Sequence, residues 1–190
     1  MKIILASGSP RRKELLSGLE IDFEVRLLPG IDESYPADTP TDKIAECIAH
    51  TKSAAYAENI ADDELLITAD TIVVVDDRIL GKPVDADDAR SMLRMISGRT
   101  HRVITGVCMK TKTRERSFSV TTDVTFKNLS SWEIDHYVDH YKPFDKAGAY
   151  GIQEWIGLVG VESISGSYFN VMGLPVQRIY KELSEFQNSR

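Results

Sequence analysis

The sequence predicts an α/β protein with a mixed β-sheet and flanking helices. Apolar, β-branched segments alternate along the chain with segments whose apolar residues recur at helical spacing, and no repeat or low-complexity tract interrupts this alternation. With 190 residues, 42% of them hydrophobic and 27% charged, the chain can bury one substantial core. Since no segment has the composition of a long linker, we expect a single domain over residues 1–190.

The first half of the chain alternates between short apolar strands and amphipathic helices. Ser9 is placed to cap the first helix, with Pro10 at its first position, and Thr41 is placed to cap the second. The expected segments are strand Ile3–Ala6, a helix from Pro10 that carries Leu15, Leu16 and Leu19, strand Phe23–Leu27, a helix from Asp42 to about Glu58, a β-rich run (Leu65–Asp70 and Ile72–Val75) broken at Asp70-Thr71, and helix Asp87–Ile96.

The second half begins with two long strands joined by a polar hairpin. Ser130 is placed to cap the helix that follows them, and Pro175 stands near the start of the closing helix. The expected segments are strands His101–Cys108 and Ser117–Lys127 around the hairpin Lys110–Arg116, helix Ser131–Tyr141, a Gly-rich loop with strand pieces at Lys146–Gln153, a loop at Ser163–Ser167, and helix Leu174–Phe186.

Composition and charge exclude several classes of protein. The formal net charge of −6 opposes a nucleic-acid-binding module and an anionic-membrane binder. No apolar run approaches the roughly 20 residues of a membrane span, and the N-terminus lacks the apolar region of a signal peptide. Cys47 and Cys108 match no metal or redox spacing and suit a reducing compartment. We therefore expect a cytoplasmic protein.

The segment Ser7–Arg12 joins the first strand to the first helix and predicts an anion site. Backbone N–H groups at a helix N-terminus bind anions, and Gly8 with two serines suits a tight turn rich in donors. Arg11 and Arg12 oppose the helix dipole there, at a cost of about 0.3–1 kcal/mol each unless an anion lies among them. Guanidinium groups match phosphate oxygens, so phosphate is the favoured anion. The alternative is that both arginines point into solvent.

Acidic residues stand at two positions that suit a site. Asp70 lies in a strongly apolar run, where a carboxylate is costly to bury unless it is paired, protonated or bound to a metal. The alternative is a strand-end Asp that caps a turn. Asp32 and Glu33 follow Pro29-Gly30 in a loop, where they are either metal ligands or solvated acids.

Three isolated lysines, Lys52, Lys82 and Lys146, are candidate phosphate-binding cations. Lys82 stands between Gly81 and Pro83, so it belongs to a loop rather than to a helix interior. Phosphoryl transfer needs several cations around the developing charge, whereas most lysines are simply solvated.

Other signals favour no function. His136 and His140 have a spacing that can bind Zn²⁺, but Asp135 and Asp139 beside them indicate a solvated helix face. His101 suits a hydrogen-bonded structural role better than acid–base chemistry. The sequence motifs of Walker ATPases, Rossmann dehydrogenases and α/β-hydrolases are absent from the sequence.

Six segments of the chain form a specific combination. They are Ala6–Arg12, Ala69-Asp70-Thr71, Gly81-Lys82-Pro83, Ser97-Gly98 with His101, Asp145–Gln153, and Gly166-Ser167-Tyr168 with Gly173-Leu174-Pro175. Taken together and in this order, they closely resemble the Maf family. The resemblance runs from residue 3 to about residue 180 and departs in the hairpin around Lys110–Arg116 and in the C-terminal tail. Ile48-Ala49 also stands where Leu-Ala is more usual in the family.

The resemblance implies an elongated mixed sheet similar to that of the inosine triphosphate pyrophosphatases, with two lobes around a cleft, and a homodimer. It also implies hydrolysis of a nucleoside triphosphate to the monophosphate and pyrophosphate, with Mg²⁺ or Mn²⁺ as cofactor. In that case Asp70 is the catalytic carboxylate and a metal ligand, and Glu33 helps to bind the metal. The implied phosphate-binding residues are Ser7, Arg12, Lys52 and Lys82, of which the three cations neutralise the leaving pyrophosphate.

One branch of the family acts on dTTP, UTP and some modified uridine triphosphates, and the resemblance to this branch is specific. It carries Arg, Thr and Gln where this chain has Arg11, Thr71 and Gln153, whereas the branch that prefers 7-methyl-GTP has a Trp after the Ser-Pro. A Gln amide offers a donor and an acceptor to the O4 and N3–H edge of uracil or thymine. We therefore expect dTTP and UTP as substrates, and Arg11 need not bind phosphate alone.

Two alternatives remain beside this hypothesis. Since Maf proteins are also linked to septum formation, the same pocket could serve a nucleotide-binding regulator of cell division that needs no turnover. The second alternative is a 7-methyl-GTP pyrophosphatase. All three take a nucleotide as partner, and none needs a nucleic acid or a membrane.

Overall fold

The computed structural model describes residues 1–188 and contains a mixed, seven-stranded β-sheet. The order is β2-β1-β3-β5-β6-β7, and β4 pairs with β3. Strand β1 is parallel to β2 and β3, whereas β4 and β7 pair antiparallel with β3 and β6. The strands are β1 Lys2–Leu5, β2 Phe23–Val25, β3 Glu64–Val75, β4 Arg78–Leu80, β5 Thr100–Lys110, β6 Glu115–Phe126 and β7 Val161–Ser165. The expected α/β class is confirmed.

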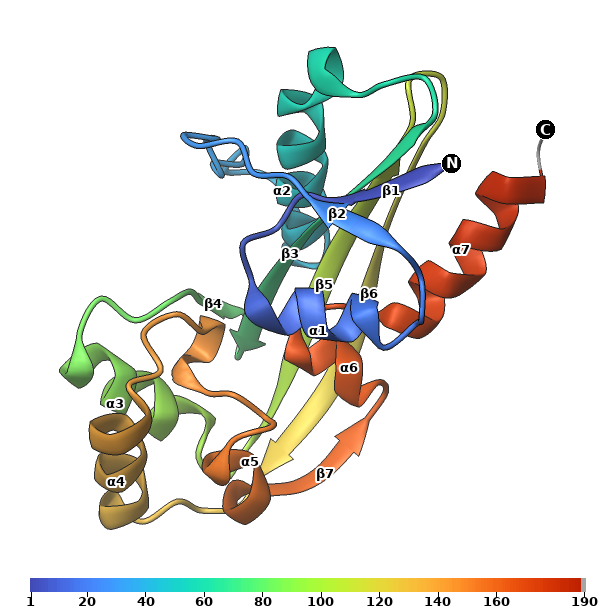
Figure 1. The fold of residues 1–190 in the computed structure, drawn as a ribbon. Helices are drawn as coiled ribbons and strands as arrows, with labels where there is room; N and C mark the ends of the chain where they lie inside the picture. The colour runs from blue at the N-terminus through green and yellow to red at the C-terminus, as the bar shows by residue number, and fades with distance from the viewer. Residues whose placement is uncertain (189–190) are drawn as a thin grey trace. The chain divides into compact units, whose positions relative to one another are not determined.

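Helices separate most of these strands along the chain (Figure 1). They are α1 Pro10–Ser17, α2 Thr41–Ala55, α3 Ala86–Ile96, α4 Ser131–Tyr141, α5 Trp155–Gly160, α6 Tyr168–Met172 and α7 Val176–Asn188, with short 3-10 turns η1 Ala57–Asn59 and η2 Ala147–Ala149. Every helix among the described residues is too short or too polar to cross a membrane.

The chain divides into two compact units. The first comprises residues 1–70, 105–120 and 173 onward, and the second comprises residues 71–104 and 121–172. Strands β3, β5 and β6 contribute residues to both units. The expectation of one domain over residues 1–190 stays a prediction.

The first unit places β1 between β2 and β3 and packs α2 against the sheet. Ile4 and Leu5 of β1 are fully buried. Gly106 of β5 faces the backbone of α2, where a Cβ would collide with Ala45 and Glu46. This glycine allows α2, which carries Lys52, to lie directly on the strand.

The second unit has its own apolar core, in which Leu93, Ile96 and Tyr137 are buried. Helices α3 and α4 pack side by side (Figure 1). On their exposed side, Arg90 of α3 donates to Asp135 at 2.8 Å and to Asp139 at 2.6 Å on α4. The polar α4 face that the sequence indicated is therefore an interhelical ion-pair surface.

Two of the three predicted helix caps are confirmed. Ser9 accepts the backbone N–H of Arg12 at the start of α1, and Ser130 forms a capping box with Glu133 at the start of α4. The prediction that Thr41 caps the second helix was wrong. Thr41 is the first residue of α2 and follows Pro40, which makes no side-chain cap hydrogen bond.

Other differences concern strand continuity and short elements. Strand β3 runs unbroken through Asp70 and Thr71, which are half-buried in an otherwise buried strand. The segment Lys146–Gln153 contains the turn η2 rather than strand pieces. Short elements β4, α5, β7 and α6 were not expected, because segments of three to six residues carry too little periodicity to be recognised.

A partly buried ion pair at the start of β3 predicts a pH-dependent stability. Arg26 donates to both carboxylate oxygens of Glu64, at 2.6 and 2.8 Å, and the N–H of Ala61 donates at 3.0 Å. These bonds, the Arg26 contact first, lower the pKa of Glu64 from 4.5 to about 2. Because the folded pKa is lowered, the stabilisation is present above pH 4.5 and is lost as the pH falls toward 2.

Replacing Glu64 by Gln is therefore expected to cost about 2–3 kcal/mol of unfolding free energy at pH 7. The variant should also lose part of the pH dependence of stability between pH 4.5 and 2. Urea unfolding of both proteins across this range measures the effect. Parallel profiles for the two proteins would contradict the assignment.

Candidate active site

The loop between β1 and α1 is a compact, donor-rich turn. Ser7 is buried, and its Oγ accepts the N–H of Ser9 at 3.3 Å. Ser9 Oγ in turn accepts the N–H of Arg12 at 3.4 Å. This hydrogen bond caps the N-terminus of α1, which begins at Pro10. The sequence Ser7-Gly8-Ser9-Pro10 thus fixes both the turn and the helix start, as its pattern predicted.

Arg12 holds this loop to two other segments of the first unit. Its Nε donates to the carbonyl of Gly173 at 2.8 Å, and Nη1 donates to Ala69 O at 2.9 Å and to Ser7 Oγ at 3.3 Å. Burial lowers the pKa of the Arg12 guanidinium, as does the adjacent Arg11, while the negative charges of Asp70 and Glu33 act against this shift. Arg12 does not simply point into solvent; it is fixed beside Ala69, in the middle of β3.

Lys52 connects the two predicted acidic residues. Its Nζ lies 2.7 Å from Asp70 Oδ1 and 3.1 Å from Glu33 Oε1. The side chains of Lys52 and Asp70 are 13% and 15% exposed, whereas that of Glu33 is 58% exposed. Helix α2, strand β3 and the loop after β2 therefore bring together a cation and two carboxylates far apart in sequence.

The donor set of Asp70 and Glu33 fits a hard divalent cation. Both carboxylates contact one positive group, the Lys52 ammonium, so their oxygens already converge on a cationic position. Mg²⁺ is usually bound by one or two carboxylates together with phosphate oxygens and water. No group of three or more His, Cys, Asp or Glu side chains suited to a metal occurs within residues 1–188. A metal at this position would therefore draw further ligands from phosphate or water.

Arg11 lies in the first turn of α1 in the first unit, whereas Thr71, Lys82 and Gln153 belong to the second unit. Thr71 directly follows Asp70 and is half-buried in β3. Lys82 is exposed, but its neighbours are fixed, because Gly81 O accepts the N–H of Gly148 at 3.0 Å and Pro83 is buried. The loop position expected for Lys82 is thus confirmed.

Gln153 carries an unused acceptor. Its Oε1 is buried and has no hydrogen-bond partner among the described residues. A buried acceptor without a donor costs about 1–3 kcal/mol. A ligand group that donates to this oxygen would remove that cost.

Lys146, a candidate phosphate-binding cation from the sequence, forms ion pairs within the second unit. Its side chain is 10% exposed, and its Nζ contacts Asp145 at 2.8 Å and Glu154 at 3.1 Å. Glu154 also accepts the hydroxyl of Tyr137 on α4. The sequence analysis did not single out Tyr137 and Glu154, because their contact joins two elements and has no local sequence signal.

The histidines have structural surroundings. His101 is 1% exposed, its Nε2 lies 2.7 Å from Tyr150 Oη, and burial lowers its pKa to about 4. A neutral, buried imidazole agrees with the structural role expected for it. On α4, the rings of His136 and His140 lie 4.3 Å apart, and His136 stacks on Trp132.

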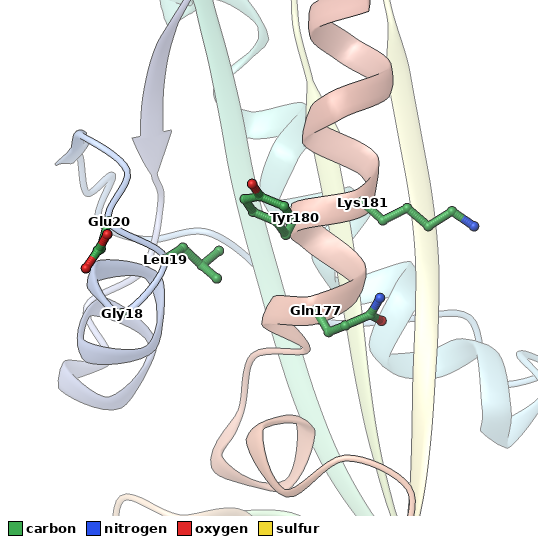
Figure 2. Close-up of a pocket in the computed structure, with 6 residues that line it drawn as sticks. All are labelled: Gly18, Leu19, Glu20, Gln177, Tyr180 and Lys181. Carbon is green, nitrogen blue, oxygen red and sulfur yellow. The ribbon is translucent and has the colours of Figure 1, made fainter.

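A pocket of about 360 Å³ lies elsewhere in the first unit, between the end of α1 and helix α7. Figure 2 shows Leu19 extending toward α7 and Lys181 pointing away from α1. The lining of this pocket also includes Gln177 and Tyr180. It contains none of the residues that the sequence predicted for a site.

The arrangement around Asp70 is suited to phosphate-anhydride chemistry. It combines fixed cations, Arg12 and Lys52, with the carboxylate of Asp70, which can accept a proton or bind a metal. The Oγ of Ser7 accepts a hydrogen bond from Arg12 at 3.3 Å, in a turn of the kind that can bind an anion. Such a set can bind phosphates and deliver water to one of them.

Comparison with protein families and curated proteins gives a consistent result. A family model described as "Maf-like protein" matches residues 2–186. A protein of Phocaeicola vulgatus named "dTTP/UTP pyrophosphatase" is 62% identical over 184 residues, covering 97% of this chain and 95% of the relative. A protein of Parabacteroides distasonis with the same name is 57% identical over 185 residues, covering 97% and 96%.

Solved structures share the fold at low sequence identity. The chain is similar to the Ham1 protein of Staphylococcus aureus, with a TM-score of 0.57 and 15% identity over 97% of this chain and 99% of that one. A HAM1 protein from Coxiella burnetii gives a TM-score of 0.50 and 13% identity over the same shares of the chains. These similarities concern the fold alone.

Proposed function

Because this chain belongs to the Maf-like protein family, we propose that it hydrolyses dTTP and UTP to the nucleoside monophosphate and pyrophosphate. The main support is the contact of Lys52 with both Asp70 and Glu33. It brings together an ammonium group and two carboxylates, which are the charged groups that the reaction needs. The names of relatives that are 62% and 57% identical over nearly the whole chain support the same substrates.

In this proposal the triphosphate binds to Ser7, Arg12, Lys52 and Lys82. Ser7 and the turn after it offer hydroxyl and backbone donors, and Arg12 is already oriented by three oxygen acceptors. Lys52 and Lys82 add positive charge for the leaving pyrophosphate. Lys82 is exposed, so its ammonium is accessible to a phosphate.

Asp70 acts as the base in the proposed reaction. Lys52 contacts Oδ1 of this carboxylate. We propose that Oδ2 accepts the proton of the water that attacks the α-phosphate. Asp70 and Glu33 are also the residues that would hold Mg²⁺ or Mn²⁺. A bound divalent metal supplies charge neutralisation and polarisation of the phosphate oxygens. The residues of the chain bind and orient the substrate and accept the proton.

Gln153, Thr71 and Arg11 are the proposed base-reading residues. The unpartnered Oε1 of Gln153 suits the N3–H of uracil or thymine, which is a donor. Cytosine has an acceptor at N3 in place of this donor, so it does not match the oxygen at the same position of the ring. The proposal therefore includes a preference for UTP over CTP.

Pyrophosphate release from a panel of nucleotides tests the proposed function. With Mg²⁺ or Mn²⁺, dTTP and UTP should be turned over in preference to CTP, GTP and 7-methyl-GTP. Preferred turnover of 7-methyl-GTP would place the chain in the other branch. Tight binding without turnover of any nucleotide would favour the regulatory alternative.

Replacing Gln153 by Ala is expected to lower kcat/KM for UTP by about 10–100-fold and to change that for CTP by less than about threefold. The reason is that only uracil and thymine use the lost acceptor. Gln177→Ala, at an exposed position of α7 labelled in Figure 2, is the matched control and should leave both values unchanged. Equal losses for UTP and CTP would contradict the role of Gln153.

The homodimer that the family resemblance implies and the cytoplasmic location that the sequence predicts belong to the same proposal. Analytical ultracentrifugation of the full chain at micromolar concentration tests the first. A monomer under these conditions would contradict it.

A further inference from the structure

The loop that carries Gln153 is closed by a nearly buried ion pair. Lys146 stands at one end of the loop and Glu154 at the other, and Lys146 Nζ lies 3.1 Å from Glu154 Oε1. Their side chains are 10% and 22% exposed. An ion pair this shielded from water is costly to break on one side, so it fixes the two ends of the loop against each other.

Tyr137 of α4 connects the ion pair to the middle of the loop. Its hydroxyl donates to Glu154 Oε2 and accepts the backbone N–H of Gly151 at 2.9 Å. Burial, with the bond to Glu154, raises the pKa of Tyr137, so the hydroxyl keeps its proton and remains a donor. Both hydrogen-bonding functions of the hydroxyl are therefore used.

Gly151 shows how closely the loop lies on the pair. A Cβ at this position would lie 2.9 Å from Glu154 Cδ and 3.0 Å from Lys146 Cε. The N–H of Glu154 also donates to Gly151 O at 3.0 Å, which tightens the turn. The backbone between residues 151 and 154 thus has little freedom.

Gln153 lies between two anchored neighbours. Ile152 on one side is 5% exposed and belongs to the apolar core of the second unit, and Glu154 on the other side belongs to the ion pair. The buried Oε1 of Gln153 makes no hydrogen bond of its own among residues 1–188. Its position is therefore set by its neighbours rather than by a partner of its amide oxygen.

We infer that Lys146, Glu154 and Tyr137 are positioning residues that hold Gln153 for the base and so set the preference for uracil and thymine. This inference rests on the proposed function. The three residues touch no substrate in this account. They act through the backbone of residues 151–154, which they fix before a nucleotide binds.

Tyr137→Phe is the test, because it removes one oxygen atom and keeps the ring in the core. It leaves Gly151 N–H without an acceptor and Glu154 Oε2 without a donor. We expect KM for UTP to rise about tenfold with kcat within about threefold, because a misplaced base contact weakens binding more than chemistry. The preference for UTP over CTP in kcat/KM should fall about tenfold.

Tyr56→Phe is the matched control in the first unit. Tyr56 is also buried, and its hydroxyl likewise accepts a backbone N–H, from Leu28 at 2.9 Å, and donates to an oxygen, Arg26 O at 3.0 Å. Loss of the Tyr56 hydroxyl should lower the thermal midpoint of unfolding by about as much as loss of the Tyr137 hydroxyl does. It should leave the preference for UTP over CTP unchanged. A purely structural role of Tyr137 would give the same result in both variants.

Glu154 provides a second, graded measurement. Glu154→Gln keeps an acceptor for Tyr137 but loses the charge that faces Lys146, and Glu154→Ala loses both. The preference for UTP should decrease from wild type to Gln to Ala, with folding checked by circular dichroism.

The outcomes separate the two claims. A wild-type protein without preference for UTP over CTP contradicts the proposed function and, with it, this inference. If the wild type prefers UTP and both Tyr137→Phe and Glu154→Ala fold and retain that preference, the positioning role alone is overturned.

Discussion

Replacing Asp70 by Asn is expected to lower kcat for dTTP by at least about 10³-fold, because the amide can neither accept the proton of water nor bind a divalent metal as a carboxylate does. The side chain keeps its shape and its contact distance to Lys52, so the fold should persist. Steady-state pyrophosphate release and thermal unfolding measure the two effects.

Asp63→Asn is the control for this prediction. Asp63 is an exposed acid in the turn just before β3, in the same unit as Asp70. It should retain wild-type turnover. Near-normal turnover in Asp70→Asn, with the same metal and substrate, would remove Asp70 from the mechanism.

Replacing Lys52 by Met is expected to lower kcat by about 10²–10³-fold, the usual loss when one charge-stabilising group is removed from an active site. The same substitution removes the ammonium that contacts both Asp70 and Glu33. Two carboxylates left without a cation should bind Mn²⁺ more tightly in the absence of nucleotide, by about tenfold. Lower turnover should therefore accompany stronger metal binding.

The amount of free Mn²⁺, measured by electron paramagnetic resonance, tests the second half of this prediction without any turnover. Lys43→Met is the matched control, since Lys43 lies on the same helix and its side chain is 56% exposed. It should leave both metal binding and kcat unchanged. Weaker Mn²⁺ binding in Lys52→Met than in wild type would contradict the view that Lys52 and the metal share the two carboxylates.

The elements that could be predicted from the sequence are those with strong local signals. Ser9-Pro10 and Ser130 with Glu133 determine helix starts through hydrogen bonds within four residues, and both were found. Asp70-Thr71 misled the prediction of β3. A polar pair indicates a strand end locally, whereas here the strand continues because the residues on both sides of the pair are buried.

The sequence predicted which residues form the candidate site but not the contacts between them. Asp70, Arg12 and Lys52 came from residue type and family resemblance, which do not reveal that Lys52 lies between two acids or that Arg12 donates to backbone carbonyls. Those contacts join residues between 18 and 161 positions apart. The ion pair of Lys146 with Glu154 could likewise not be predicted, because nothing in the sequence around Lys146 indicates which acid it contacts.

Hydrolysis of UTP in ¹⁸O-labelled water tests the central claim most directly. The account predicts UMP and pyrophosphate as the products, in equal amounts, with the label in UMP because water attacks the α-phosphate. Label in the pyrophosphate, or release of single phosphates from the end of the chain, would contradict it.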